Sequence, residues 1–537
     1  MPTLLPLALL ASRPGADTFA KMFARTPFAG IHQLAWFDWA MLIPYFTVLI
    51  ILSVYGIHRY EVIHRYFKHR HKATREPSPH VFEQLPPVTI QLPLYNERYV
   101  VERLIEEVLK VEYPKELLQI QVLDDSTDDT APFAEALVER YRNMGYPIEY
   151  HHRTHRHGYK AGALQEGLET ATGELVAVFD ADFCPPADFL KRTVNYFADP
   201  QVGVVQTRWS YINRDYNFLT EVEAMLLDGH FILEHGARSS AGYFFNFNGT
   251  AGILRKKMIA DAGGWQHDTL TEDSDLSYRA QLKGWRFVYL PGLNCPSELP
   301  VEMHGFQVQQ SRWAKGLTQV AKKLLPAILK ADIPKRVKAE AILHLTPNIS
   351  YPLMIVVSAL MLPVMIVRFY MGPLQMVFID LPLIAASFWS ISAFYVVAQR
   401  ELYPKHWKRS ILMLPMLMAV GVGLTIINTR AVLEALLGVQ TAFARTAKYA
   451  IGDRPVNLEV KKYRRRSGWL PYAELLVGTY FLGMIGFAID TYNFFSIPFL
   501  ALFVFGYYWA GFSTLYQEYQ GRLKWLKQQK LLAARTV

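Results

Sequence analysis

The distribution of apolar residues along the chain constrains its fold more than any other feature. The stretch Trp39–Ile57 carries no charged residue, and at about 1.5 Å of rise per residue it is long enough to cross a bilayer as a helix. Long apolar runs are then absent from Val88 to about Ser297. They return in four stretches, which are Ile349–Val367, Leu381–Ala398, Leu475–Ile489 and Phe494–Tyr516. This pattern predicts a polar domain inserted into a bundle of membrane helices.

The placement of basic residues indicates on which side of the membrane each segment lies. The formal net charge is +9, but Lys and Arg gather beside the apolar runs, as they do in the cytoplasmic loops of membrane proteins. A nucleic-acid-binding surface is therefore disfavoured. Basic clusters stand on both sides of Ile411–Leu437, so we expect this stretch to be an interfacial helix on the cytoplasmic face. The result is five spans, an external N-terminus and a cytoplasmic polar domain.

Short β-rich strings such as VTIQLPLY and LVAVFDAD alternate with helical stretches in the polar region, which is typical of an α/β layered domain. The predicted segments are an extracytoplasmic or interfacial start (1–34), a membrane helix (35–58), a basic cytoplasmic linker (59–87), the α/β domain (88–300), interfacial helices (301–340), two membrane helices (341–398), the interfacial helix (411–437), a cytoplasmic loop (438–468), two membrane helices (469–517) and a cytoplasmic tail (518–537).

Two adjacent aspartates end one of the apolar strings. In VLDDSTDDT, Asp124 and Asp125 close a predicted strand, and a helix is predicted to begin near Asp128. Ligands of open α/β sheets bind at the carboxyl ends of the strands, so we expect Asp124 and Asp125 to face a ligand. Asp128 fits a helix N-cap as well as it fits a ligand contact, and both interpretations stay open.

A second acidic pair follows a strongly apolar string. LVAVFDADFCP brings Asp180 and Asp182 to the same sheet edge, on one side of an extended backbone. Two carboxylates beside a diphosphate suit Mg²⁺ or Mn²⁺, which would neutralise charge on a departing nucleotide. A DxD sequence alone is common by chance, but this one ends a buried strand and follows another strand-ending pair. We therefore predict a metal site at Asp180 and Asp182.

The string HDTLTEDSDLSYRAQLKGW holds the catalytic candidates. Thr271 is predicted to cap a helix with Glu272 and Asp273 in its first turn, where the helix dipole alone would favour acidic residues. Transfer to a hydroxyl acceptor nevertheless needs a carboxylate that takes the proton. Glu272 and Asp273 are therefore the catalytic candidates, and Asp273 is the candidate base.

A glutamine-rich string precedes the returning apolar runs. In FQVQQSRWAKG, the residues Gln309, Gln310, Arg312 and Trp313 fit within one helical turn and share a patch. Arginine suits a diphosphate through its planar fork, and tryptophan suits the apolar face of a sugar ring. Taken alone, the string fits an interfacial anchor at the level of the lipid headgroups at least as well.

Shorter strings add binding candidates, although each also fits an ordinary loop. The first strand ends where a base and ribose would sit, a lysine begins a helix beside a glycine, and FNFNGTAGILR contains a polar turn suited to an acceptor. The residues are Tyr95, Asn96 and Glu97 for the nucleotide, Lys160 for the diphosphate, and Asn248 and Gly249 for the acceptor.

The strings QLPLYNE, VLDDSTD, FDADF, FNGTAGILR, TEDSDL and QQSRW occur in this order. Together they resemble family 2 glycosyltransferases of the cellulose synthase and hyaluronan synthase superfamily, and among these the plant cellulose-synthase-like mannan and glucan synthases. The resemblance covers about residues 88–448. It implies a GT-A domain, that is, a Rossmann-like mixed α/β sheet, and inverting transfer from a nucleotide sugar.

The resemblance also implies roles for single residues. Asp124 would contact the nucleotide, Asp180 the ribose or diphosphate, and Asp182 the metal. Asp273 would be the base. The acceptor and pyrophosphate site would be formed by Gln309, Arg312 and Trp313.

The string FARTAK is similar to the FxVTxK gating loop of cellulose synthases. It places Phe443, Thr446 and Lys448 at matching positions, and it departs from the pattern with Arg445 where that loop has Val.

The leading hypothesis is a processive synthase in a plasma, inner or Golgi-type membrane that extends a β-1,4-linked hexan and passes it through its own helices. GDP-mannose and UDP-glucose are both open as donors, and the resemblance favours mannan or glucomannan. The alternative is a single-transfer enzyme that glycosylates a lipid of the ceramide type. A transporter without catalysis would need polar residues inside the spans, and these contain few.

Overall fold

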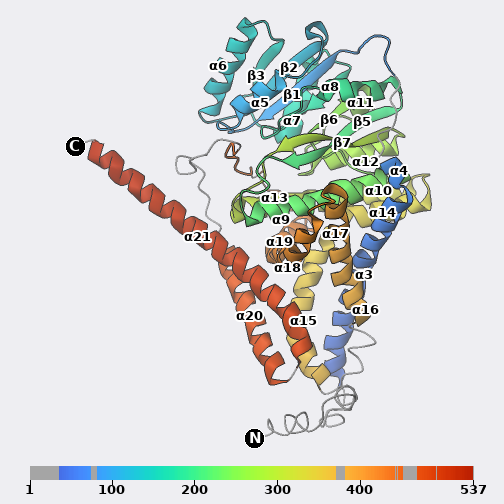
Figure 1. Ribbon diagram of the computed structural model, residues 1–537, viewed down its shortest axis with the longest axis vertical. Coiled ribbons are helices and arrows are strands. Elements are labelled where there is room, and N and C mark those ends of the chain that lie inside the picture. Colours follow the sequence, from blue (N-terminus) through green and yellow to red (C-terminus); the bar gives the residue numbers. More distant parts are fainter. Residues whose placement is uncertain are drawn as a thin grey trace.

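The computed structural model describes residues 35–73, 81–369, 381–441, 443, 445–451, 468–491 and 493–535. A sheet domain forms one end of the molecule and a helical bundle the other, and helices lying across the axis separate them (Figure 1). The predicted α/β domain inserted into a helical bundle is confirmed. The predicted N-terminal segment 1–34 lies outside the described residues.

The sheet has seven strands in the order β3-β2-β1-β4-β6-β5-β7. β1 to β4 run parallel, β6 is antiparallel to its neighbours β4 and β5, and β5 is parallel to β7. The strands are β1 (Val88–Leu94), β2 (Leu118–Asp124), β3 (Ile148–His152), β4 (Leu175–Val178), β5 (Val202–Tyr211), β6 (Gly252–Arg255) and β7 (Arg286–Ser297).

Helices cover both faces of the sheet, so the central strands are buried on both sides and read as nearly continuous apolar runs. Alternate residues of β4 enter different cores: Leu175 and Ala177 pack with α5, α6 and α8, whereas Val176 and Val178 pack with α7, α11 and α12. These helices are α5 (Val101–Val108), α6 (Thr130–Asn143), α7 (Tyr159–Thr170), α8 (Phe189–Thr193), α11 (Lys256–Asp261) and α12 (Glu272–Leu282).

The layer between the sheet domain and the bundle is formed by helices that come from both halves of the polar region. They are α9 (Phe218–Gly229), the π-helical turn η3 (His230–His235), α10 (Gly236–Ala241), α13 (Met303–Lys330) and α14 (Lys335–Leu345). α13 carries the QQSRW string and runs directly beneath the sheet domain (Figure 1).

A glycine lets α13 approach α12 closely. A Cβ atom on Gly316 would lie 2.8 Å from the backbone nitrogen and 2.5 Å from Cγ2 of Thr271, the residue that precedes α12. Any side chain at this position would push the two helices apart. Glycine therefore brings the QQSRW string and the acidic first turn of α12 to the same place.

Four helices of the described residues are long and apolar enough to cross a membrane: Trp36–Lys68, Pro347–Phe369, Leu470–Asp490 and Phe494–Leu523. They belong to α3 (Trp36–Lys68), α15 (Ser350–Phe369), α20 (Leu470–Asp490) and α21 (Ile497–Arg535). The chain is thus a membrane protein, and α21 continues beyond the bundle toward the C-terminus (Figure 1).

Two further stretches of the bundle bear on the predicted number of spans. α18 (Trp407–Gly423) and α19 (Thr425–Leu436) bend by 44° at Leu424, and the pair would be a fifth span if it crosses. The helix from Leu381 to Leu402 is divided into α16 (Leu381–Ile384), the π-helical turn η6 (Ala385–Trp389) and α17 (Ser390–Leu402), and it is not among the four. The predicted sidedness of these segments stays a prediction.

Candidate active site

A cavity of about 190 Å³ lies at the edge of the sheet where β1 and β4 end. α12, α13, Phe443 and residues 445–448 complete its walls. Most of the predicted site residues line it, although they are spread over the chain from the first strand to the segment after α19. They are Tyr95, Glu97, Asp125, Lys160, Asp180, Asp182, Asn248, Gly249, Glu272, Asp273, Gln309, Arg312, Trp313, Phe443, Thr446 and Lys448.

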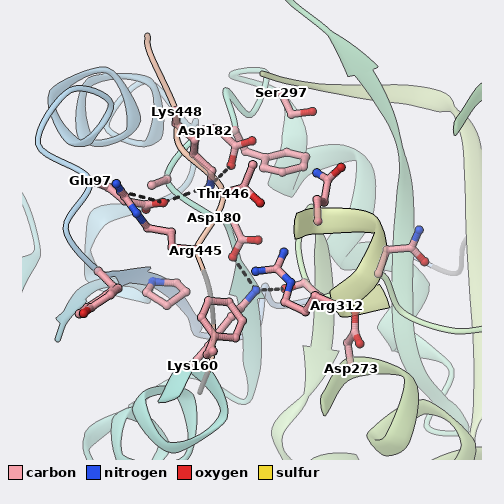
Figure 2. A pocket seen from close by; sticks show the side chains of 18 of the residues that line it. Glu97, Lys160, Asp180, Asp182, Asp273, Ser297, Arg312, Arg445, Thr446 and Lys448 are labelled. Atoms are coloured by element: carbon pink, nitrogen blue, oxygen red, sulfur yellow. Dashed lines mark hydrogen bonds and ion pairs between the residues drawn. The ribbon is translucent and has the colours of Figure 1, made fainter. Parts of the chain in front are cut away.

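Each carboxylate of the DxD pair contacts a lysine. Lys160, in the first turn of α7, lies 2.5 Å from an oxygen of Asp180 and donates to the carbonyl of Gly249 at 2.9 Å. Lys448 comes from the other side of the cavity and contacts both Asp182 and, at 3.3 Å, Glu97 (Figure 2). Burial works against the charged form of both lysines, but the surrounding carboxylates outweigh it and raise both pKa values. The pairs hold positive charge at the positions predicted for a metal.

The carboxylate oxygens at this edge suit a divalent cation that binds together with a phosphate group. Among the described residues no group of three or more His, Cys, Asp or Glu side chains is arranged for a metal ion. Mg²⁺ is commonly held by one or two carboxylates together with substrate phosphates. Asp180 and Asp182 supply such carboxylates, and the ammonium groups of Lys160 and Lys448 each contact one oxygen of the pair.

The two acidic residues of α12 face the cavity. α12 begins at Glu272 as predicted, although the hydroxyl of Thr271 makes no capping hydrogen bond. An oxygen of Asp273 accepts from the backbone N–H of Ser274 at 2.7 Å. Burial and then the negative charge of Glu272 raise the pKa of Asp273 to about 7. A carboxyl group with this pKa is suited to accept a proton near neutral pH.

Gly249 has a backbone that allows Asp273 to approach. Its φ of +79° is rarely adopted by other residues, and a Cβ atom here would lie 2.9 Å from an oxygen of Asp273. The FNGTAG turn therefore sits directly against the candidate base.

α13 contributes the cationic and aromatic wall. Gln309, Arg312 and Trp313 line the cavity, and the guanidinium of Arg312 lies 4.5 Å from the ring centroid of Phe443. Burial is the main cause of a lowered pKa for Arg312, although the acidic residues nearby oppose it. Gln310, the fourth residue of the predicted patch, is not among the lining residues. Arg312 lies beside Asp180 and Asp273 (Figure 2).

Three residues predicted near the nucleotide do not line the cavity. Asp124 is fully buried, and its carboxylate accepts from the backbone N–H of Ser126 and from the hydroxyl of Tyr150, both at 2.8 Å. Asp128 accepts from the N–H of Thr130, the first residue of α6, although the N-cap position of this helix is Asp129. These two carboxylates are engaged within the protein.

Asn96 does not line the cavity either, and its polar groups bond to other residues of the protein. It has a φ of 54°, its side-chain oxygen accepts from the N–H of Thr127 at 2.8 Å, and its carbonyl accepts from Arg445. Asp125 does line the cavity, but Arg153 engages both of its oxygens.

The segment 443–448 is held in the cavity by a residue that the sequence interpretation did not single out. Glu298, after β7, accepts from the backbone N–H groups of Tyr449 at 2.6 Å and Ile451 at 3.1 Å. Arg103 pairs with the same carboxylate at 3.1 Å. Glu298 belongs to the SELP string, but no local signal in the sequence indicates which segment it binds.

A second unforeseen set of contacts fixes the side chain of Asn248. Its amide nitrogen lies 3.2 Å from Nε2 of His230, and Nδ1 of His230 lies 2.9 Å from a carboxylate oxygen of Glu234. In the neutral imidazole, Nδ1 then donates to Glu234 and Nε2 accepts from Asn248. The Asn248 oxygen accepts from Asn246 at 2.9 Å. Both histidine contacts depend on the π-helical turn η3, and such turns are frequent at functional sites.

The mixed sheet, the acidic pair after β4 and the cation-lined cavity define a GT-A-type domain. Residues 86–316 match the family described as "Glycosyltransferase like family 2". This match includes all seven strands of the sheet, so the predicted resemblance to family 2 glycosyltransferases is confirmed for the sheet domain.

Relatives of similar sequence are plant enzymes. Glucomannan 4-beta-mannosyltransferase 1 of Oryza sativa subsp. japonica is 43% identical over 253 residues, 46% of this chain and 48% of the relative. Glucomannan 4-beta-mannosyltransferase 9 of Arabidopsis thaliana is 44% identical over 244 residues, 44% of this chain and 46% of the relative. The chain thus spans about half the length of these relatives.

A solved structure with a similar fold is the mannosyltransferase PcManGT from Pyrobaculum calidifontis, in complex with GDP-Man and Mn2+. The similarity covers 74% of this chain and 100% of that chain, with a TM-score of 0.50 and 24% sequence identity.

Proposed function

We propose that this chain is an inverting, metal-dependent membrane glycosyltransferase that extends a β-1,4-linked mannan or glucomannan from GDP-mannose. The names of the plant relatives support the sugar and the linkage. The observation that carries the proposal is the cavity, in which Lys160, Arg312 and the DxD carboxylates face Asp273. Transfer from a sugar diphosphate to a hydroxyl requires cations for the diphosphate and a poorly acidic carboxyl group as base, and this pocket offers both.

Asp273 is the proposed base. In its ionised form it accepts the proton from the attacking hydroxyl of the glycan, while the sugar departs from the diphosphate on its opposite face. With a pKa of about 7, Asp273 is substantially ionised at neutral pH and binds the transferred proton more strongly than an ordinary carboxylate. The adjacent Glu272 keeps the local potential negative and so favours proton uptake.

The cationic residues are proposed to hold the diphosphate. Lys160 reaches the cavity from the start of α7, and Arg312 presents a planar guanidinium from α13, a group that binds phosphate oxygens in pairs. Asp180 and Asp182 would hold Mg²⁺ or Mn²⁺, which would neutralise charge on the departing nucleotide. A metal ion at Asp182 would have to displace Lys448 from this carboxylate. Residues 445–448 would therefore move, or the side chain of Lys448 would rotate, when the donor and its metal bind.

The acceptor is proposed to lie along α13 and to leave through the bundle. Trp313 lines the cavity and packs beside Tyr211 and Leu299, so its indole can support the apolar face of a sugar ring. Asn248 offers an oriented amide on the other side. α13, which contributes Gln309, Arg312 and Trp313 to the cavity, lies in the layer between the sheet domain and the bundle (Figure 1). This placement supports synthesis at the cytoplasmic face coupled to translocation.

The test is a donor screen on the full chain purified in detergent or nanodiscs. Nucleotide release is measured with GDP-mannose and with UDP-glucose, each with Mg²⁺ or Mn²⁺, and radiolabelled product is digested with β-1,4-mannanase. We expect a polymer from GDP-mannose that the mannanase degrades, and no release from the Asp182→Asn variant. A glycolipid product would replace the proposal with the single-transfer alternative, and turnover of UDP-glucose alone would refute the proposed donor.

A further inference from the structure

Arg156 is a cation in the cavity wall whose orientation is fixed by two aromatic rings. Its guanidinium carbon lies 3.2 Å from the ring centroid of Tyr95 and 4.9 Å from that of Tyr159. The ring of Phe443 follows at 5.7 Å. A guanidinium held on an aromatic face in this way keeps its N–H groups in one plane. Arg156 therefore presents a rigid set of donors.

One of those donors has no acceptor in the part of the chain that the structure describes. The Nε atom of Arg156 is buried and has no hydrogen-bond partner among the described residues. The nearest strand-ending carboxylate, Asp125, is engaged at both oxygens by Arg153. Burial accordingly lowers the pKa of Arg156. A buried donor without an acceptor costs free energy. A ligand that accepts a hydrogen bond from Arg156 would remove this cost and so bind more tightly.

The topology indicates which part of a nucleotide sugar lies against Arg156. β1 stands between β2 and β4 in the sheet. Tyr95 and Asp125 follow β1 and β2, whereas Asp180 and Asp182 follow β4. Lys160, Asp180 and Asp182 mark the diphosphate end of the site. Arg156 stacks upon Tyr95 at the β1 and β2 side of the site, away from Asp180 and Asp182. If the diphosphate lies at Asp180 and Asp182 and the sugar at Asp273, the nucleobase is the part of the donor that lies against Arg156.

The bases differ in what they offer to a guanidinium. Guanine presents two adjacent acceptors, O6 and N7, to which arginine binds in a bidentate manner. Uracil places an N–H donor beside its O4 acceptor, so one donor of the guanidinium would meet another donor. We propose that Arg156 recognises the base of the donor nucleotide and selects guanine over uracil. This inference rests on the proposed function, because it assumes a nucleotide sugar in this cavity.

The test measures dissociation constants of GDP, UDP and inorganic pyrophosphate by calorimetry on the full chain with saturating Mn²⁺. The variant Arg156→Lys keeps the charge and loses the planar fork. We expect it to weaken GDP binding by roughly tenfold or more and to change UDP and pyrophosphate binding less than threefold. Arg98→Lys is the matched control, because Arg98 stacks on Phe133 at the same 3.2 Å but is not among the lining residues.

Three other results would contradict the proposal, and each would contradict a different part of it. An equal loss for all three ligands would assign Arg156 to the diphosphate, and unchanged GDP binding would remove it from nucleotide recognition. Wild-type protein that binds UDP more tightly than GDP would refute the proposed donor as well. A dissociation constant does not depend on the fraction of folded protein, and Arg156→Gln provides a second variant that retains a donor without the charge.

Discussion

Replacing Glu272 with Gln should move the acidic limb of the activity profile to lower pH. The pKa of Asp273 is about 7 against an ordinary value of 3.8, first because of burial and second because of the charge of Glu272. The base must be ionised, so activity is present above pH 7 and is lost as the pH falls through 7. Gln keeps the shape of Glu272 and removes the charge, which leaves burial and the smaller effect of Asp180 to raise the pKa of Asp273.

The size of the effect can be worked out from this pKa. A group with a pKa of about 7 is roughly one-tenth ionised at pH 6, so wild-type kcat/KM at pH 6 should be roughly one-tenth of its plateau. If the charge of Glu272 contributes on the order of 1.4 kcal/mol, the limb of the variant lies about one pH unit lower. Its relative kcat/KM at pH 6 then rises to roughly one-half.

The assay is nucleotide release from GDP-mannose between pH 5 and 9, at fixed ionic strength. Asp273→Asn should be inactive throughout while it still binds GDP, and Glu139→Gln, an exposed change on α6, should reproduce the wild-type profile. The reasoning is refuted if the acidic limb of Glu272→Gln coincides with that of the wild type. It is equally refuted if kcat/KM is flat between pH 5 and 8.

Three more results are expected. Gly316→Ala should lower stability by about 1–3 kcal/mol and reduce activity, because its Cβ meets Thr271, whereas Gly421→Ala, with open space around its Cβ, should lower neither; equal melting temperatures for the two variants would contradict this. Glu298→Gln should release the backbone N–H groups after Lys448 and speed tryptic cleavage near Arg445, and an unchanged cleavage rate would count against the anchoring role. His230→Ala should raise the KM for a mannan acceptor several-fold without changing GDP affinity; a loss of GDP binding instead would mean that the histidine supports the donor site or the fold.

The sequence indicated the elements whose signals are local. Apolar strings that end in aspartates placed Asp180 and Asp182 at a sheet edge, since a buried strand in a layered domain must deliver its next residues to that edge. The acidic first turn after Thr271 and the helical spacing of Gln309, Arg312 and Trp313 were readable for the same reason. These residues depend on neighbours within a few positions of the chain.

Local patterns did not distinguish a carboxylate that is open to a ligand from one that is hydrogen-bonded within the protein. Asp124 and Asp125 look alike in the sequence, yet Asp124 is enclosed with Tyr150, and Arg153 engages Asp125. These partners lie far along the chain, on or just after β3. Hydrogen-bond partners at such separations leave no periodic signal, because each contact requires only one side chain on each segment.

The tertiary structure alone decided how the cavity is closed and charged. Lys448 meets Asp182, and Glu298 binds the segment after Lys448, only because that segment returns from the membrane bundle to the sheet edge. Gly316 allows α13 to approach Thr271 closely, and the π-helical turn places His230 against Asn248; composition encodes neither contact. The sequence by itself determined which chemical groups stand at the ends of the strands. Packing between distant segments determined which of those groups face the cavity and which cations neutralise them, because that depends on where whole helices come to rest.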